Sequence, residues 1–117
     1  MCGIFAVTDN INAAKLAYVG LFTLQHRGQE SAGMVSDCGG RLLYYSAMGL
    51  VNEVFSNEVL ANLQGRSVIG HIRYSTTGSS NLKNAQPLFF NSCLGQLAVA
   101  HNGNITNAAK LRAELAK

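Results

Sequence analysis

The order in which strand-like and helix-like stretches follow one another constrains the fold of this chain most. Apolar, β-rich runs bounded by turn residues lie at positions 3–8, 32–36, 41–46, 67–74, 87–91 and 96–101. The second and third runs flank the turn sequence Asp37-Cys38-Gly39-Gly40, and the last two runs also lie close together, as in hairpins. Strands that come in pairs, rather than in strict alternation with helices, favour an α+β fold with mainly antiparallel sheets.

Helical spacing of apolar residues separates these strand pairs. Residues 10–24 predict a helix of about four turns, with Asp9 or Asn10 available to cap its start. Residues 50–63 predict one or two helical pieces with a break near their middle. Thr106 is a plausible N-cap for a final helix that continues to the last residues of the sequence.

Length and charge exclude several classes of protein. At 117 residues the chain has room for one domain at most, and a formal charge of +3 from scattered basic residues does not indicate nucleic-acid binding. No apolar run approaches the ~20 residues of a membrane span, and no signal peptide is recognisable, which predicts a cytoplasmic protein without a membrane partner. The odd count of three cysteines, which lie far apart, argues against a disulfide framework, and the histidines share no metal-ligand spacing.

Cys2 stands where a reactive residue is easily activated. Removal of Met1 would leave Cys2 as the first residue, with a thiol and a free α-amine together. Because the amine titrates near pH ~8 and the thiol near ~8.5, the pair supplies a nucleophile and a general base, with one ordered water able to relay the proton. The alternative is that Cys2 is a small apolar residue near a frayed terminus.

Arg73 lies near the end of an apolar strand and opens onto a hydroxyl-rich loop at residues 75–78. A guanidinium fixed beside hydroxyl groups is suited to a bidentate grip on a carboxylate. The alternative is an arginine whose aliphatic stem lies on the protein surface while its charged end stays in water.

Asn102 and Gly103 follow the last predicted strand. An asparagine side-chain amide and the backbone N–H of the next glycine can converge on one oxygen atom and form an oxyanion hole. Asn-Gly is also a common hairpin turn, which is the alternative interpretation. A helix signal rather than a second strand follows this pair, and that order disfavours the hairpin.

Four motifs, in order, carry a resemblance to a known family. They are Met1-Cys2-Gly3-Ile4-Phe5, the octapeptide His26-Arg27-Gly28-Gln29-Glu30-Ser31-Ala32-Gly33, Gly70-His71-Ile72-Arg73-Tyr74-Ser75-Thr76-Thr77-Gly78 and Ala100-His101-Asn102-Gly103-Asn104. With these motifs the chain resembles the class II glutamine amidotransferases, whose glutaminase domain is an N-terminal-nucleophile hydrolase. The resemblance covers essentially the whole chain and implies a four-layer αββα sandwich.

The resemblance also implies roles for individual residues. Cys2 would be the nucleophile and its α-amine the base, while Asn102 and Gly103 would form the oxyanion hole. Arg73 would bind the α-carboxylate of glutamine. The other implied substrate-binding residues are Thr76 and Thr77 in the adjacent loop, Arg27 and Gly28 at the border of the nucleophile's pocket, and His101. The aspartate that binds the α-amine in this family would lie beyond Lys117.

Within the family, the octapeptide and residues 79–87 are most similar to the amidophosphoribosyltransferase branch, which makes phosphoribosylamine in the first step of purine synthesis. Glucosamine-6-phosphate synthases would be expected to carry Arg-Gly-Tyr-Asp in the octapeptide, and asparagine synthetases Arg-Gly-Pro-Asp. The resemblance therefore implies L-glutamine and phosphoribosyl pyrophosphate as substrates, and a homo-oligomer at full length.

The family's domains are longer than this chain. We therefore expect residues 1–117 to be the N-terminal portion of a glutaminase domain, inactive alone, with the rest of that domain and a phosphoribosyltransferase domain absent. No cofactor is expected in this segment; Mg²⁺ is expected at the missing phosphoribosyltransferase domain, and an iron–sulfur cluster is left open. The alternatives are the glutaminase of a glucosamine-6-phosphate synthase, asparagine synthetase or glutamate synthase, and a catalytically silent binding module on the same fold.

Overall fold

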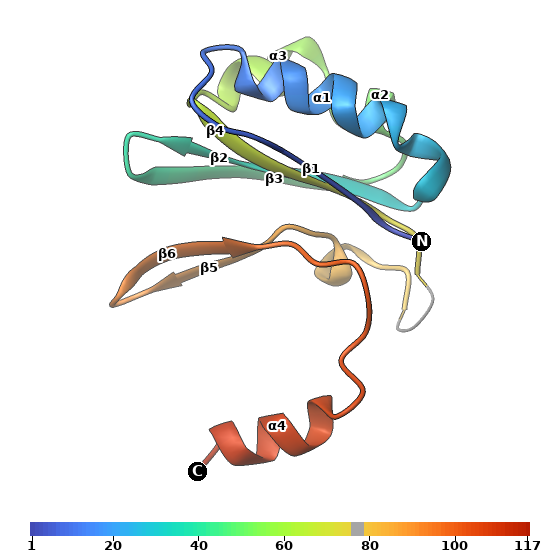
Figure 1. The fold of residues 1–117 in the computed structure, drawn as a ribbon, viewed down its shortest axis with the longest axis vertical. Coiled ribbons are helices and arrows are strands. Elements are labelled where there is room, and N and C mark those ends of the chain that lie inside the picture. The colour runs from blue at the N-terminus through green and yellow to red at the C-terminus, as the bar shows by residue number, and fades with distance from the viewer. Residues whose placement is uncertain (76–78) are drawn as a thin grey trace.

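The computed structural model describes residues 1–75 and 79–117, which are arranged in layers (Figure 1). Helices α1 (Ala13–Thr23), α2 (Val51–Val54) and α3 (Asn57–Asn62) cover one face of a sheet formed by β1 (Gly3–Val7), β2 (Ser31–Cys38), β3 (Arg41–Met48) and β4 (Ser67–Arg73). On the other side of that sheet lie the hairpin β5 (Leu88–Ser92) and β6 (Gly95–Val99) and, beyond it, α4 (Ala108–Leu115). The predicted α+β class and the αββα order of layers are both confirmed.

The main sheet has the strand order β1–β4–β2–β3, and every neighbouring pair is antiparallel. The predicted turn between β2 and β3 is confirmed: Gly39 and Gly40 have φ angles of 64° and 89°, and Asp37 Oδ1 accepts a hydrogen bond of 2.8 Å from Gly40 N. In the pairing of β1 with β4, Gly3 lies opposite Ile72. This register brings the N-terminus beside the end of β4.

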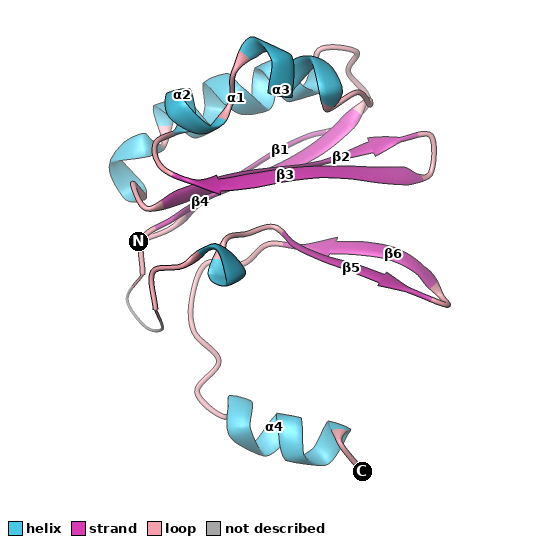
Figure 2. Ribbon diagram, turned by 180° about the vertical axis from the view of Figure 1, so that it is seen from behind, coloured by secondary structure: helices cyan, strands magenta, loops and turns pink. Residues whose placement is uncertain are grey.

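The core lies between the main sheet and helices α1–α3, which all cover the same face in the reverse view (Figure 2). Leu21 of α1, Met34 of β2 and Ile72 of β4 are fully buried there. Gly70 allows the close contact, because a Cβ at this position would lie 2.7 Å from Leu21 Cδ1. Helix α1 therefore packs directly against β4 at Gly70.

The predicted break within residues 50–63 is confirmed, because α2 ends at Val54 and α3 begins at Asn57. Ser56 lies between the two helices, and its Oγ accepts a hydrogen bond of 3.2 Å from Val59 N. A serine hydroxyl that binds a free N–H of the first turn is a common way to start a helix.

The predicted helix caps were wrong in position. Helix α1 has Asn12 at its N-cap, since Asn10 Oδ1 binds the backbone N of Asn12 at 2.8 Å and closes a turn before the helix begins. Asp9 instead forms an exposed ion pair of 2.9 Å with Arg66. At α4 the N-cap is residue 107, so Thr106 lies one position too early.

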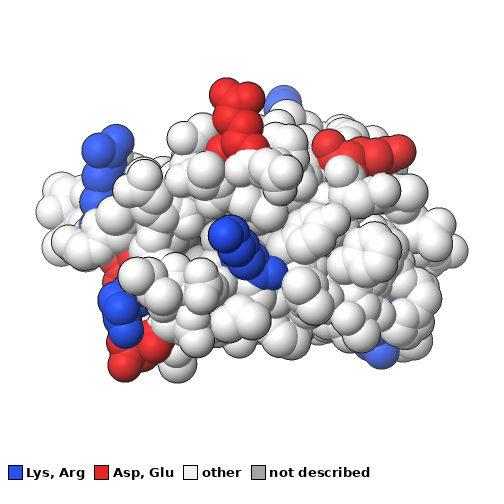
Figure 3. Space-filling view, turned by 90° about the horizontal axis from the view of Figure 1, so that it is seen from above, with Lys and Arg blue, Asp and Glu red and all other residues white. Residues whose placement is uncertain are grey.

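Charged side chains are scattered over the face that carries the helices and form no single basic patch there (Figure 3). In the part of the chain that the structure describes, no helix is both long enough and apolar enough to cross a membrane.

Candidate active site

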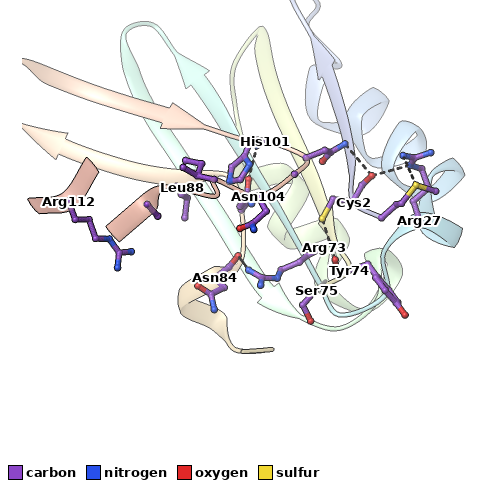
Figure 4. A pocket seen from close by; sticks show the side chains of 16 residues that line it. Cys2, Arg27, Arg73, Tyr74, Ser75, Asn84, Leu88, His101, Asn104 and Arg112 are labelled. Atoms are coloured by element: carbon purple, nitrogen blue, oxygen red, sulfur yellow. Dashed lines mark hydrogen bonds between the residues drawn. The ribbon is translucent and has the colours of Figure 1, made fainter. Parts of the chain in front are cut away.

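A pocket of about 640 Å³ opens where the N-terminus, the end of β4 and the segment after β6 meet (Figure 4). Six residues predicted from the sequence line it: Cys2, Arg27, Arg73, His101, Asn102 and Gly103. Four separate stretches of the chain contribute these side chains. The fold therefore gathers in one place residues that are up to 101 positions apart.

Cys2 lies immediately before β1, and hydrogen bonds to its backbone carbonyl group hold it in place. Its carbonyl oxygen accepts hydrogen bonds from Arg27 Nε at 3.0 Å and from Asn102 Nδ2 at 3.2 Å. Its thiol donates to the carbonyl oxygen of Tyr74 at a distance of 3.6 Å. Met1 is 70% exposed, and its sulfur lies 3.9 Å from Arg27 Nη2. Arg27 and Asn102 thus hold the backbone of Cys2, whereas most of the preceding residue, Met1, is exposed to solvent.

Asn102 and Gly103 lie in a bend between β6 and α4, so the hairpin-turn interpretation was wrong. Gly103 has a φ angle of 135°, a conformation that side-chain-bearing residues rarely adopt. A Cβ there would meet no atom within 4 Å, so the backbone conformation, and not a lack of space, calls for glycine. The bend points the Asn102 amide at Cys2.

Arg73 lies beside the carboxylate of Glu30, a residue to which the sequence analysis assigned no role. Its Nη1 donates to the carbonyl oxygen of Asn84, and its Nε lies 4.0 Å from Glu30 Oε2. The Arg73 side chain is only 12% exposed, which contradicts the alternative of an arginine lying on the surface. Ser75 Oγ donates a 2.7 Å hydrogen bond to Glu30 Oε1. This bond lowers the pKa of Glu30, with a smaller contribution from Arg73, and keeps the carboxyl ionised.

Gly28 does not line the pocket. It lies behind Arg73, where a Cβ would fall 2.8 Å from the carbonyl carbon of that residue. Its role is therefore to let the chain pass close to the end of β4. The predicted binding residues Thr76 and Thr77 lie outside the described residues.

His71 and Gln86 also contribute to the site, although the sequence interpretation gave them no function. His71 is fully buried in β4, and its Nε2 lies 3.2 Å from the carbonyl oxygen of His101. The backbone N of His101 donates a 2.8 Å hydrogen bond to Gln86 Oε1. Burial lowers the pKa of His71 to about 4, so its ring is neutral at pH 7. The only sequence signal was that His71 lies in one of the four motifs of the family resemblance and Gln86 in residues 79–87, which are similar to one branch of the family.

No three His, Cys, Asp or Glu side chains lie together in a possible metal-binding group within residues 1–75 and 79–117. The pocket instead combines a thiol with three arginines and three asparagines. Such a set can hold a carboxylate and stabilise a negative oxygen beside a sulfur nucleophile.

Known proteins share this arrangement of motifs and fold. The amidophosphoribosyltransferase of Methanocaldococcus jannaschii is 50% identical over 117 residues, and that of Archaeoglobus fulgidus is 53% identical; each match covers 98% of this chain and 25% of the relative. Among solved structures, the fold is similar to glutamine phosphoribosylpyrophosphate (PRPP) amidotransferase from B. subtilis complexed with ADP and GMP, with a TM-score of 0.87 and 42% identity. It is also similar to a structure described as the allosteric regulatory enzyme of purine biosynthesis, with a TM-score of 0.90 and 43% identity.

The chain spans about a quarter of the length of these relatives. The family described as glutamine amidotransferases class-II matches residues 1–116, which is nearly the whole sequence. The fold, the pocket and this match agree, and the chain belongs to the class-II glutamine amidotransferases.

Proposed function

We propose that this segment is the glutaminase part of an amidophosphoribosyltransferase. It would hydrolyse the side-chain amide of L-glutamine and release ammonia for transfer to phosphoribosyl pyrophosphate, which gives phosphoribosylamine in the first step of de novo purine synthesis. The observation that carries the proposal is the 3.2 Å contact between the Asn102 amide and the backbone carbonyl oxygen of Cys2, which supports Asn102 as an oxyanion donor next to Cys2 as nucleophile.

The proposed reaction begins once Met1 has been removed. The α-amine of Cys2 takes the thiol proton, directly or through a water, and the thiolate attacks the amide carbon of glutamine. The carbonyl oxygen becomes negative in the tetrahedral intermediate and is met by the Asn102 side chain and the Gly103 N–H. The protonated amine then gives its proton to the leaving nitrogen, ammonia departs and a thioester remains. Water hydrolyses the thioester to glutamate and frees the thiol.

Arg73 would hold the α-carboxylate of glutamine during these steps. Its side chain already lies near one carboxylate, that of Glu30, and Glu30 and Asn84 hold the guanidinium at the floor of the pocket. A guanidinium fixed in place loses less conformational entropy when it binds its ligand. Arg27 would close the pocket beside the nucleophile, where it binds the carbonyl oxygen of Cys2. We assign Thr76, Thr77 and His101 to the same substrate pocket and Gly28 to its border.

The proposal for the rest of the protein follows the names of the relatives. We propose that residues 1–117 are the N-terminal portion of the glutaminase domain, and that the phosphoribosyltransferase domain with its Mg²⁺ belongs to another part of a cytoplasmic homo-oligomer. The names of the relatives support phosphoribosyl pyrophosphate as acceptor over the acceptors of glucosamine-6-phosphate synthases or asparagine synthetases. The pocket, with Cys2, Arg73 and Asn102 together, disfavours a catalytically silent module.

The free amine of Cys2 provides the decisive experiment. In the protein at its full natural length, an N-terminal extension that cannot be removed should abolish ammonia release from glutamine, because the nitrogen of Cys2 is then an amide. The control carries the same extension with a protease site directly before Cys2, and cleavage should restore activity. Full activity of the extended protein would remove the amine from the mechanism, and no ammonia release after cleavage would contradict the proposed function itself.

Thiol labelling gives an independent check. A glutamine-shaped electrophile should label Cys2 and spare the other two cysteines, because only Cys2 lies in the pocket. Exposure alone would predict the opposite, since Cys93 is exposed whereas Cys2 is half-buried. Peptide mapping that found Cys93 labelled first would contradict the assignment.

A further inference from the structure

Two buried side chains hold the peptide groups of His101. Its N–H donates to Gln86 Oε1 at 2.8 Å, and its carbonyl oxygen lies 3.2 Å from His71 Nε2. The side chain of His71 is fully buried, and Gln86 is only 7% exposed. Both backbone polar groups of the residue directly before Asn102 are thus bound by side chains from other parts of the chain.

The direction of the His71 contact follows from its chemistry. A carbonyl oxygen can only accept a hydrogen bond, so Nε2 must carry the proton. A neutral imidazole has one N–H, which leaves Nδ1 as the unprotonated nitrogen. Nδ1 indeed has no hydrogen-bond partner among the described residues. His71 therefore acts as a fixed donor to the His101 carbonyl group.

The main sheet supplies the rigid support for this contact. His71 lies between Ile4 of β1 and Gly33 of β2 in the sheet. Gly33 has no side chain to keep the Gln86 segment away, since a Cβ there would lie 2.2 Å from the carbonyl oxygen of Gln86. The main sheet and the segment that carries Gln86 are therefore in direct contact at Gly33, the residue that pairs with His71.

The hairpin and the bend contain little packing of their own. Strand β6 has no fully buried residue, and Asn102 and Gly103 are exposed. A loop of this kind keeps a catalytic amide in place only if other groups hold its backbone, and a misplacement of about 1 Å can cost about 10²-fold in rate.

We propose that His71 and Gln86 form a clamp on the backbone of His101 that positions Asn102 and Gly103 for oxyanion stabilisation. The clamp rests on the proposed function, because it concerns the oxyanion hole of that reaction. His71 and Gln86 are assigned as positioning residues because the side chains of both bind the backbone of His101, and the ring of His71 also interacts with the Asn102 side chain.

The test compares two substitutions of His71 in the protein at its full natural length. His71→Leu fills the buried site with an apolar side chain and removes the donor, and kcat for glutamine hydrolysis should fall about 10- to 100-fold with KM nearly unchanged. His71→Gln places an amide N–H near the position of Nε2 and should recover most of that loss. Ile69→Ala is the matched control, because it lies two residues away on the same face of β4 and should lower stability without changing kcat per folded molecule.

Gln86→Met tests the other half of the clamp. It removes the acceptor for His101 N–H and should lower kcat in the same way as His71→Leu. The double variant should lose little more than the more severe single variant, because both changes release the backbone of the same residue, His101, one at its N–H and the other at its carbonyl oxygen. Fully additive losses would overturn the idea of one shared clamp.

Nuclear magnetic resonance on histidine labelled with ¹⁵N gives a readout that does not depend on activity. At pH 7 His71 should be neutral with its proton on Nε2, and an Nδ1–H form would overturn the clamp. Wild-type kcat in folded His71→Leu would also overturn it while leaving the glutaminase assignment intact. If His71→Leu does not fold, the Gln86→Met kinetics and the tautomer decide. Absence of glutaminase activity in the wild-type protein would instead contradict the proposed function.

Discussion

The helix-covered half of the molecule and the half beyond the main sheet are held in different ways. The first half has a core in which Leu21, Met34 and Ile72 are fully buried. In the second half, β5, β6 and α4 contain no buried residue, and Leu115 is 87% exposed. Packing therefore fixes the first half, whereas a few hydrogen bonds from buried side chains fix the part of the second half that reaches the pocket.

The pocket lies where the two halves meet, and each half supplies one part of the proposed chemistry. Cys2 and Arg73 come from the packed sheet, while Asn102 and Gly103 come from the exposed bend. Changes in the packed core of the first half, away from the pocket, should therefore affect mainly stability, and changes in the bend should affect mainly turnover. The following predictions, which all refer to the protein at its full natural length, test this division.

Asn102→Ala should have the largest effect. Removal of one oxyanion donor should lower kcat by about 10²–10³, or about 3–4 kcal/mol, with KM and melting temperature nearly unchanged. Asn107→Ala is the control from the same segment, since its side chain makes no capping hydrogen bond to α4. Steady-state kinetics per folded molecule decide the matter, and an unchanged kcat in Asn102→Ala would reduce Asn102 to a bend residue.

Leu21→Ala should show the opposite behaviour. It empties a fully buried site between α1 and Gly70 and should lower the free energy of unfolding by about 3 kcal/mol. Leu16→Ala, on the same helix but 43% exposed, should cost clearly less. Urea unfolding measures both, and ammonia release per folded molecule should stay at the wild-type rate. A large fall in kcat for Leu21→Ala would break the proposed division.

His71 should make the junction between the halves sensitive to acid. Burial, with smaller contributions from the nearby His101 and Arg73, lowers its pKa from 6.5 to about 4, although the hydrogen bonds that its ring makes with the His101 carbonyl oxygen and the Asn102 side chain act in the opposite direction. The folded state therefore resists protonation, so its stability is fully present above pH 6.5 and is lost as the pH falls towards 4. The loss should reach about 3 kcal/mol. His71→Gln should lack this part of the pH dependence. Urea unfolding of the wild-type protein and of His71→Gln, above pH 6.5 and near pH 4, measures the difference.

Glu30→Gln should have the smallest effect and should fall on binding. It removes the negative charge 4.0 Å from Arg73 Nε but keeps an oxygen that can accept from Ser75 Oγ. We expect the KM for glutamine to rise by about tenfold or less, with kcat nearly unchanged. Arg73→Lys, which loses the planar fork, should raise KM more. Equal kcat losses in both variants would show that Arg73 acts on the transition state instead.

Local sequence signals predicted the elements well and the contacts between them poorly. The hairpin around Gly39 and the break before α3 depend on neighbouring residues, and both were found as predicted. Thr106 was assigned one position too early as a cap, because the choice between adjacent polar residues depends on the path of the preceding chain. Hydrogen bonds of Glu30 with Ser75 and of His71 with His101 join residues 45 and 30 positions apart. No periodicity reports such a pair.

The pairing of β1 with β4 has a further consequence for Cys2, the proposed nucleophile. The first residues of a protein are usually among its least ordered. Here five residue pairs, from Gly3 with Ile72 to Val7 with Val68, tie β1 into the sheet one position after Cys2. The strand thus fixes the position of Cys2 along the sheet. One residue inserted or deleted at position 3 would shift the thiol by about 3.3 Å, and it would also turn the thiol away from Asn102, because side chains alternate between the two faces of a strand. If Cys2 is the nucleophile, the number of residues between it and the sheet should matter as much as the cysteine itself.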